Sequence, residues 1–375
     1  MSLISADSHV LEPPDLWLNY IDPAFRDSAP VLKHDEDADR WYVGSTFYGD
    51  IGHVTQAGQR YEDATQIKLE GRWEGVPVSA YEPGPYLDAL AIDGTAAAVI
   101  YPTEGLYLYR VPEVPLANAI FQAYNRWIAD FCRHDPLRLV GVAMLTLEDI
   151  DFAVKEVERI GKDGLKVAMI PVYPAAGQPY SDRRYEPFWK AAADAGLILS
   201  MHAATNRPGS SELDNDLKSV TPATRTTLDY WVRHSLAEIM FAGVFERYPT
   251  IKIVSVENEI GWIPHFIKQM EFVYAERQYL TPVRFSGNRT PRDVWRSNVL
   301  ATFLEDDVGI SMRGYIGTET LMWGSDFPHS ESTWPNSRQV LDKILEGVSP
   351  SEKVDMVFGN ATRVFGFSDF VTAPE

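Results

Sequence analysis

Eight short apolar runs, separated by amphipathic stretches, constrain the fold of this chain more than any other feature of its sequence. They are rich in Val, Ile, Leu and Ala and lack strict alternation, which is typical of strands covered on both faces. The runs span residues 4–10, 96–102, 139–145, 165–171, 197–203, 251–257, 298–303 and 321–326. They predict eight buried strands.

The stretches between these runs indicate how the strands connect. The clearest helical patterns cover residues 115–134, 149–162, 183–196 and 227–249, and Gly196 is a natural helix C-cap before the next strand. Repeated strand–helix units imply parallel strands with right-handed crossovers. Eight units predict an α/β fold, a (β/α)8 TIM-type barrel, although an open doubly wound sheet also fits.

Residues 30–80 break this rhythm and predict an inserted hairpin and lid after the first strand. WYVGSTFYGD (41–50) has the pattern of a hairpin, and the polar stretch after it has no periodicity. Loops of this length are often functional, so we expect the insertion to fold over the barrel mouth. A second long polar loop covers residues 205–228. No linker divides the chain, and residues 1–375 are predicted to form a single domain.

Charge and cysteine usage narrow the partners and the compartment. The net charge of −19 would repel nucleic acid and anionic membranes, so we expect neither as a partner. No apolar run reaches the roughly 18 residues of a membrane span, and no signal peptide is evident. The single cysteine, Cys132, lies in an apolar helical stretch and is expected to be a small buried hydrophobe. A cytoplasmic location is therefore predicted.

Residue types that bind metals gather where the predicted strands end. They are Asp7, His9, His202, Glu257 and Asp326. In a parallel barrel the catalytic groups cluster at the strand ends, and residues two apart on a strand, such as Asp7 and His9, face the same way. Alone, Asp7 more often caps a turn and His202 more often lies in a core. Their coincidence favours a metal site, and carboxylates with imidazoles suit Zn, Mn or Fe(II).

Other residues near these positions are candidates for further roles. Asp326 and Glu257 are candidates for moving protons, since a water-poor mouth raises the pKa of a carboxyl group. His329 follows Pro328 on the same loop and is predicted to line the mouth in a catalytic or substrate role. Arg233 and His234 are expected to bind an anionic substrate, although His234 also fits an exposed helix face.

Three motifs resemble a known family. ADSHVLEPPDLW, FAGVFERYPTIKIVSVENEIGWIP and WGSDFPHSESTWPNS are similar to the amidohydrolase-related group of the amidohydrolase superfamily. That group contains aminocarboxymuconate semialdehyde decarboxylase and the γ-resorcylate-type decarboxylases. The resemblance covers essentially the whole chain. It implies a barrel with a divalent metal at its mouth and a homo- or hetero-oligomer.

The resemblance also assigns residues. The family's metal ligands fall on Asp7, His9, His202 and Asp326. The first-strand motif departs from the more frequent H-x-H or E-x-H, since it reads Asp-Ser-His here. Many of the decarboxylases carry a histidine after the sixth strand as the catalytic acid or base, whereas the nearest titratable group here is Glu257.

These observations leave three functional hypotheses. The first is a metal-dependent hydrolase or decarboxylase-like carboxy-lyase that acts on a small carboxylated molecule with one metal ion. The second is a dinuclear Fe or Mn–Fe oxygenase similar to 2-aminoisobutyric acid hydroxylase, in which Glu257, with Glu12 or His329, helps to hold a second ion. The third is a catalytically silent partner subunit that retains one metal.

Overall fold

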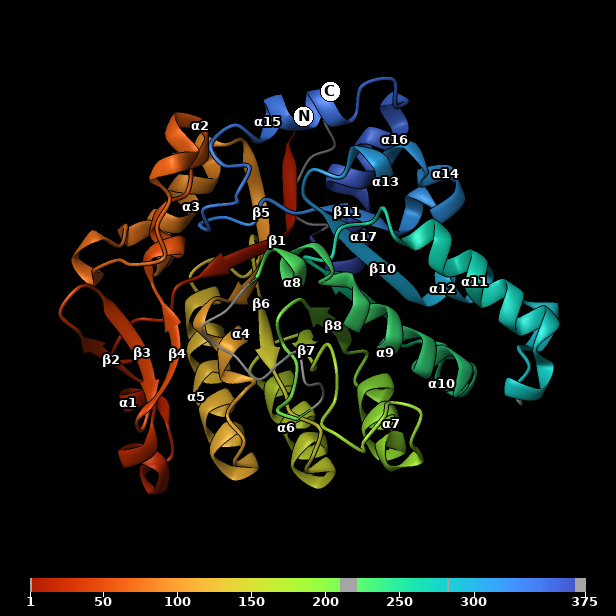
Figure 1. Ribbon diagram of the computed structural model, residues 1–375, viewed down its shortest axis with the longest axis horizontal. Helices are drawn as coiled ribbons and strands as arrows, with labels where there is room; N and C mark the ends of the chain where they lie inside the picture. Colours follow the sequence, from red (N-terminus) through yellow and green to blue (C-terminus); the bar gives the residue numbers. More distant parts are fainter. Residues whose placement is uncertain (1, 210–220, 282, 368–375) are drawn as a thin grey trace.

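Eight parallel strands form one sheet in the computed structural model, which describes residues 2–209, 221–281 and 283–367. Each strand pairs with the next along the chain, apart from the strands of an insertion. The strands are β1 Leu3–Val10, β5 Thr95–Pro102, β6 Leu139–Met144, β7 Val167–Met169, β8 Ile198–His202, β9 Ile253–Val256, β10 Val299–Phe303 and β11 Leu321–Trp323. Helices surround this nearly closed barrel (Figure 1), as expected for the TIM-type fold.

The two ends of the sheet meet where β1 lies beside the segment that follows β11. The backbone N–H of Asp326 donates to the carbonyl of Asp7 at 2.9 Å, and the N–H of His9 donates to the carbonyl of Phe327 at 2.6 Å. Gly324 permits this approach, because a Cβ there would lie 2.4 Å from the Cβ of Asp7. The closure of the barrel thus brings its first and last strand ends together.

All eight predicted strands are present, which confirms the barrel and excludes the open sheet. Six are shorter than predicted, and the clearest differences are at β7, which has three residues, and at β11, which ends before Gly324. The helices are α1 Leu16–Tyr20, α2 Gln59–Asp63, α3 Pro83–Ile92, α4 Glu104–Leu108, α5 Val114–Cys132, α6 Ile150–Lys162, α7 Glu186–Asp194, α8 Pro222–Thr226, α9 Asp229–Phe241, α10 Val244–Arg247, α11 Ile263–Glu276, α12 Pro291–Asn298, α13 Asp307–Ser311, α14 Arg313–Ile316, α15 Ser337–Ile344, α16 Pro350–Val354 and α17 Asn360–Phe365.

Local chemistry explains several helix boundaries. The Asp149 side chain accepts the backbone N–H of Phe152 and begins α6. Gly196 follows α7 with φ +62°, as its prediction as a C-cap requires. The helix predicted over 227–249 is in fact two helices, α9 and α10, because Gly243 adopts φ +72° between them. A left-handed residue cannot continue an α-helix.

The insertion contains the predicted hairpin and one strand that the pattern did not predict. Strands β3 Asp39–Val43 and β4 Thr46–Asp50 pair antiparallel, and β2 Val31–His34 adds a third strand. This small sheet lies at one side of the barrel, near α1 and α5 (Figure 1). Further along the insertion, the Tyr61 hydroxyl of α2 donates to the carbonyl of Thr333 at 3.3 Å. This later part therefore reaches the loop that follows β11.

The core is apolar and extends from the barrel strands to the surrounding helices. Cys132 lies buried there as a free thiol, as predicted. No helix in the described ranges is long and apolar enough to cross a membrane. Of the long loop predicted over 205–228, residues 210–220 lie outside the described residues.

Candidate metal centre

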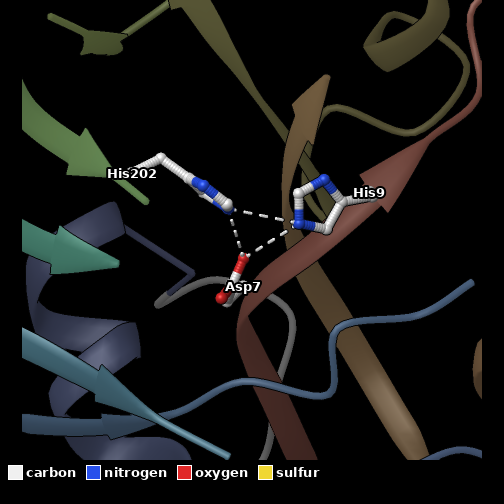
Figure 2. A group of neighbouring side chains, drawn as sticks. All are labelled: Asp7, His9 and His202. Carbon is white, nitrogen blue, oxygen red and sulfur yellow. Dashed lines mark hydrogen bonds and ion pairs between the residues drawn. The ribbon is translucent and has the colours of Figure 1, made fainter. Parts of the chain in front are cut away.

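The carboxyl ends of β1, β8 and β11 bring four ligand-type side chains together. Asp7 and His9 come from β1, and their Oδ1 and Nε2 atoms lie 3.4 Å apart. The His202 Nε2 at the end of β8 lies 3.3 Å from the His9 Nε2 and 3.7 Å from the Asp7 Oδ1. Figure 2 shows these three side chains pointing toward one another. The Asp326 Oδ1 lies 3.3 Å from the His9 Nε2.

The backbone fixes which nitrogen of each imidazole faces the centre. The Nδ1 of His9 lies 2.8 Å from the carbonyl of Pro102, and the Nδ1 of His202 lies 2.9 Å from the carbonyl of Ala203. A carbonyl oxygen can only accept, so each Nδ1 carries the hydrogen. Each Nε2 therefore faces the centre and offers a lone pair there once it carries no proton. This arrangement is typical of imidazoles that bind a metal.

The carboxylates are equally unsatisfied. The Oδ1 atoms of Asp7 and Asp326 are buried, and neither has a hydrogen-bond partner other than the histidines of the cluster in the described part of the chain. Buried polar atoms without partners are rare in proteins. Two such oxygens facing two imidazole lone pairs form a donor set that a divalent cation would satisfy. The residues present therefore fit a metal ion.

Burial and the neighbouring charges of the cluster shift the pKa values of these groups. Burial works against the ionisation of Asp7, but His202 and His9 outweigh it and hold the pKa of Asp7 below its usual range. Burial raises the pKa of Asp326. Burial also lowers the pKa of His9, whereas Asp7 and Glu257 overcome burial at His202 and raise its pKa to about 9. In the metal-free protein, protons on Asp326 and His202 reduce the negative charge of the cluster, which a bound cation would otherwise balance.

Glu257 lies beside this set, as expected for a residue after the sixth strand of the barrel. Its Oε2 is 3.3 Å from the His202 Nε2, and its Oε1 is 3.4 Å from the Arg225 Nη1. Burial raises the pKa of Glu257 to about 7. Glu257 and Asp326 have φ of +56° and +59°, a conformation that costs energy in residues other than glycine and clusters at functional sites.

His329 joins the cluster from the loop after β11. Its Nδ1 is 2.8 Å from the Asp326 Oδ1, and its ring centroid is 4.0 Å from that of His9. The Nε2 of His329 is 3.0 Å from the Thr103 hydroxyl. Burial lowers the pKa of His329 to about 4, so the ring is neutral at physiological pH.

A cavity of about 390 Å³ opens above these residues and contains two arginines that sequence reasoning did not single out. Arg60 comes from α2 of the insertion and pairs with Glu305. Arg225 comes from α8 and pairs with Glu331 at 2.6 Å. The predicted lid was the only signal for Arg60. No motif marked Arg225, because its place depends on a long loop.

Arg233 and His234, predicted to bind substrate, are not among the residues lining this cavity. Arg233 pairs with Asp229 at 3.0 Å on the same helix, α9. His234 is partly exposed and lies 3.6 Å from Glu238. A role for these two residues in substrate binding stays a prediction.

Glu12 has a structural role in the described residues. Its carboxylate accepts the backbone N–H groups of Thr103, Glu104 and Gly105 at 3.3, 3.0 and 2.8 Å. These N–H groups belong to the start of α4, which Glu12 therefore caps. The structure does not place Glu12 in either candidate group of metal ligands, Asp7 with His9 and His202 or His9 with Asp326 and His329.

Comparisons with known proteins agree with this geometry. Residues 70–367 match the family model described as Amidohydrolase. A γ-resorcylate decarboxylase from Rhizobium sp. (strain MTP-10005) is 21% identical over 268 residues, which cover 68% of this chain and 78% of the relative. This confirms the resemblance carried by the three sequence motifs.

Solved structures give the same result at the level of the fold. An amidohydrolase from Mycobacterium avium subsp. paratuberculosis K-10 superposes with a TM-score of 0.76 at 20% identity, covering 97% of this chain and 99% of the other. A 5-carboxyvanillate decarboxylase from Novosphingobium aromaticivorans with bound manganese gives 0.68 at 17% identity, covering 97% of each chain. Since the family model spans most of its length, the chain belongs to the amidohydrolase family and is an enzyme of that family.

Proposed function

We propose that this protein is a divalent-metal-dependent carboxy-lyase that decarboxylates a small aromatic carboxylate. One observation carries the proposal. Asp7, His9 and His202 form a buried group of ligand atoms, and Asp326 lies 3.3 Å from the same His9 Nε2. Asp7 and Asp326 line a cavity that also contains two arginines. The γ-resorcylate and 5-carboxyvanillate decarboxylases that resemble the chain favour this reaction over hydrolysis.

The four ligand residues would hold the cation. When bound, it supplies positive charge that binds the substrate's carboxylate and an adjacent oxygen and stabilises negative charge that develops in the reaction. Manganese is the proposed ion, since it is bound in the 5-carboxyvanillate decarboxylase structure. Zn and Fe(II) accept the same ligands.

Arg60 and Arg225 are the proposed contacts for the substrate's anionic groups. Both line the cavity, and a guanidinium group matches the geometry of a carboxylate. Each arginine is already paired with a glutamate, Arg60 with Glu305 and Arg225 with Glu331. These glutamates keep the guanidinium groups in place before a substrate arrives.

Glu257 is the proposed proton donor. Decarboxylation breaks the bond between the ring carbon and the carboxyl carbon, CO₂ leaves, and the ring carbon takes a proton. Glu257 lines the cavity, and its raised pKa of about 7 keeps part of it protonated near neutral pH. Asp326 also lines the cavity but is one of the four proposed ligands, and His329, 2.8 Å from its Oδ1, is proposed to hold it in place.

The other hypotheses receive less support. Two of the three similar proteins reported above are decarboxylases and none is described as an oxygenase, which disfavours the dinuclear oxygenase. A silent subunit would not need both arginines at the cavity. The oligomeric state and the cytoplasmic location stay predictions.

Elemental analysis and CO₂ release would test the proposal. Protein purified without added metal or chelator should contain about one divalent ion per chain, and it should release CO₂ from members of a panel of hydroxylated benzoates. His202→Ala should lose both the ion and the activity. His265→Ala, a matched change on an exposed part of α11, should lose neither. Wild-type protein that binds no metal after reconstitution would contradict the proposal.

A further inference from the structure

Thr103 is the first residue after β5, and its hydroxyl reaches the metal centre through His329. The side chain is 1% exposed. It occupies the N-cap position of α4, where a threonine ordinarily accepts a backbone N–H of the helix. It makes no such bond here. Its described hydrogen bond joins the hydroxyl to the Nε2 of His329 at 3.0 Å.

Glu12 releases Thr103 from the capping role. The Glu12 carboxylate accepts three N–H groups at the start of α4, including that of Thr103 itself. The helix start is satisfied without the threonine hydroxyl. This division of roles leaves the hydroxyl to His329.

The Thr103 hydroxyl donates this hydrogen bond and the His329 Nε2 accepts it. A buried hydroxyl needs an acceptor for its hydrogen, and the His329 Nε2 is the acceptor that the described residues provide. If Nε2 instead carried the hydrogen, the Thr103 proton would lack an acceptor. With Asp326 ionised, as a metal ligand must be, the Nδ1 lone pair of His329 would then also lie 2.8 Å from the Asp326 Oδ1. Both consequences are unfavourable.

We propose that Thr103 is a positioning residue that holds His329 in the tautomer with hydrogen on Nδ1, facing Asp326. In this tautomer the His329 Nδ1 has no lone pair for a metal. His9, Asp326 and His329 could otherwise form a second group of ligands beside Asp7, His9 and His202. Asp326 is then available as a ligand beside Asp7, His9 and His202, and the centre binds one ion rather than two.

The tautomer can be measured directly in metal-free protein. Long-range ¹H–¹⁵N spectra of protein labelled with ¹⁵N-histidine distinguish a protonated ring nitrogen from an unprotonated one, and His329→Gln identifies the signals of His329. We expect hydrogen on Nδ1 in the wild type and in Thr103→Ser, which keeps the hydroxyl. Thr103→Val has nearly the same shape without it, and its His329 signals should shift toward the other tautomer.

Metal binding supplies the second readout. Competition with a chelator should show that Thr103→Val binds Mn²⁺ about 10–100-fold more weakly than the wild type, as is usual when a residue that orients a ligand is lost. Thr103→Ser should restore the affinity. Hydrogen on Nε2 in the wild type would overturn the proposal, as would a Thr103→Val protein with unchanged tautomer and affinity.

This inference rests on the proposed metal centre but not on the proposed reaction. If Thr103→Val does not fold, the spectra of the wild type and Thr103→Ser still decide the assignment. A protein with the expected tautomer that releases no CO₂ from any benzoate would contradict the proposed reaction alone. A protein that decarboxylates with His329 in the other tautomer would contradict this inference alone.

Discussion

The backbone of Glu257 and Asp326 is left-handed, which indicates that these two positions require a carboxyl group. Their φ angles of +56° and +59° suit glycine, which adopts such angles without a steric penalty. A charged side chain is retained at both despite the cost, so the carboxyl group, and not the turn, is what the position needs. The distance of 3.3 Å between the Asp326 Oδ1 and the His9 Nε2 separates Asp326 from an ordinary turn aspartate.

Replacing Glu257 should separate the chemical step from metal binding. Glu257→Gln keeps the shape but cannot donate a proton as an acid, so kcat should fall about 10²–10⁴-fold. The metal content should stay as in the wild type, because Glu257 is outside the four-ligand set proposed here. Steady-state kinetics and elemental analysis on one preparation would check both. Glu319→Gln, on the surface, serves as the control, and equal loss of metal and activity would instead make Glu257 a ligand.

The sequence predicted some of the residues that meet at this site and not others. Asp7, His9, His202, Glu257 and Asp326 are visible because each follows an apolar run, and parallel strands bring such positions to one end of a barrel. Thr103 also follows a strand, but threonine there has the ordinary meaning of a helix cap. Its contact with His329 depends on Glu12 occupying the helix start, which no spacing indicates.

At the scale of elements, the junction between β1 and β11 depends on Gly324. A Cβ at this position would lie 2.4 Å from the Cβ of Asp7 and 3.2 Å from its Cα. The neighbouring atoms are backbone or close to it and cannot rotate away. The glycine is therefore required by close packing, since its φ is not in the left-handed region.

Gly324→Ala should push β11 away from β1 and destabilise the fold by roughly 1–3 kcal/mol, as overpacking in a filled core does. Urea unfolding would give the change in the free energy of unfolding. Because Asp7 and Asp326 lie on either side of the contact, metal affinity should also fall. Gly314→Ala, where no atom lies within 4 Å of the added Cβ, is the matched control. Equal stability of the two variants would contradict this account.

The insertion and the barrel meet at a buried carboxyl group. Glu104 is 1% exposed, and neither oxygen has a partner in the described part of the chain. A Cβ on Gly49 of β4 would lie 2.5 Å from the Glu104 Oε2. Burial, with the charges of Glu12 and Asp50, raises the pKa of Glu104 well above its usual value of 4.5. Burial therefore favours the protonated, neutral form of Glu104 in the folded protein.

This raised pKa makes the stability of the fold depend on pH. An acid with a higher pKa in the folded state binds more protons when folded, so its contribution is fully present below pH 4.5 and is lost as pH rises toward the folded pKa. Glu104→Gln cannot ionise. Its free energy of unfolding should therefore fall less between about pH 5 and pH 8 than that of the wild type. Urea titrations at several pH values would show this, and parallel curves for the two proteins would contradict it.

The sequence predicted the architecture of the whole molecule better than it predicted individual contacts. Eight apolar runs predicted eight barrel strands, because strands buried on both faces must be apolar throughout. The hairpin of the insertion was predicted and β2 was not, since β2 has only four residues and two of them are exposed. The partners of Arg60 and Arg225 lie far away in the chain, and local patterns carry no information about them.

Removing the metal should lower the stability of the whole protein. A ligand that binds only the folded state at a hundred times its Kd adds about 2.7 kcal/mol. For a chain of this size we expect a rise in Tm of roughly 3 °C on adding Mn²⁺ to chelator-treated protein. Thermal unfolding followed by calorimetry would measure it. His202→Ala should show no rise, and a rise as large as that of the wild type would place the ion elsewhere.

The loop that carries Asp326 and His329 also supports the insertion. Tyr61 donates to the carbonyl of Thr333 in this loop, and Gly58 lies against Trp334 and Pro335. This loop thus carries the proposed ligand Asp326 and also contacts the part of the insertion that contains Gly58 and Tyr61. If cation binding orders this loop, it also favours the packed position of the insertion beside it. The packed insertion then favours cation binding to the same extent. We therefore expect cation binding and the position of α2 beside the cavity to be thermodynamically coupled.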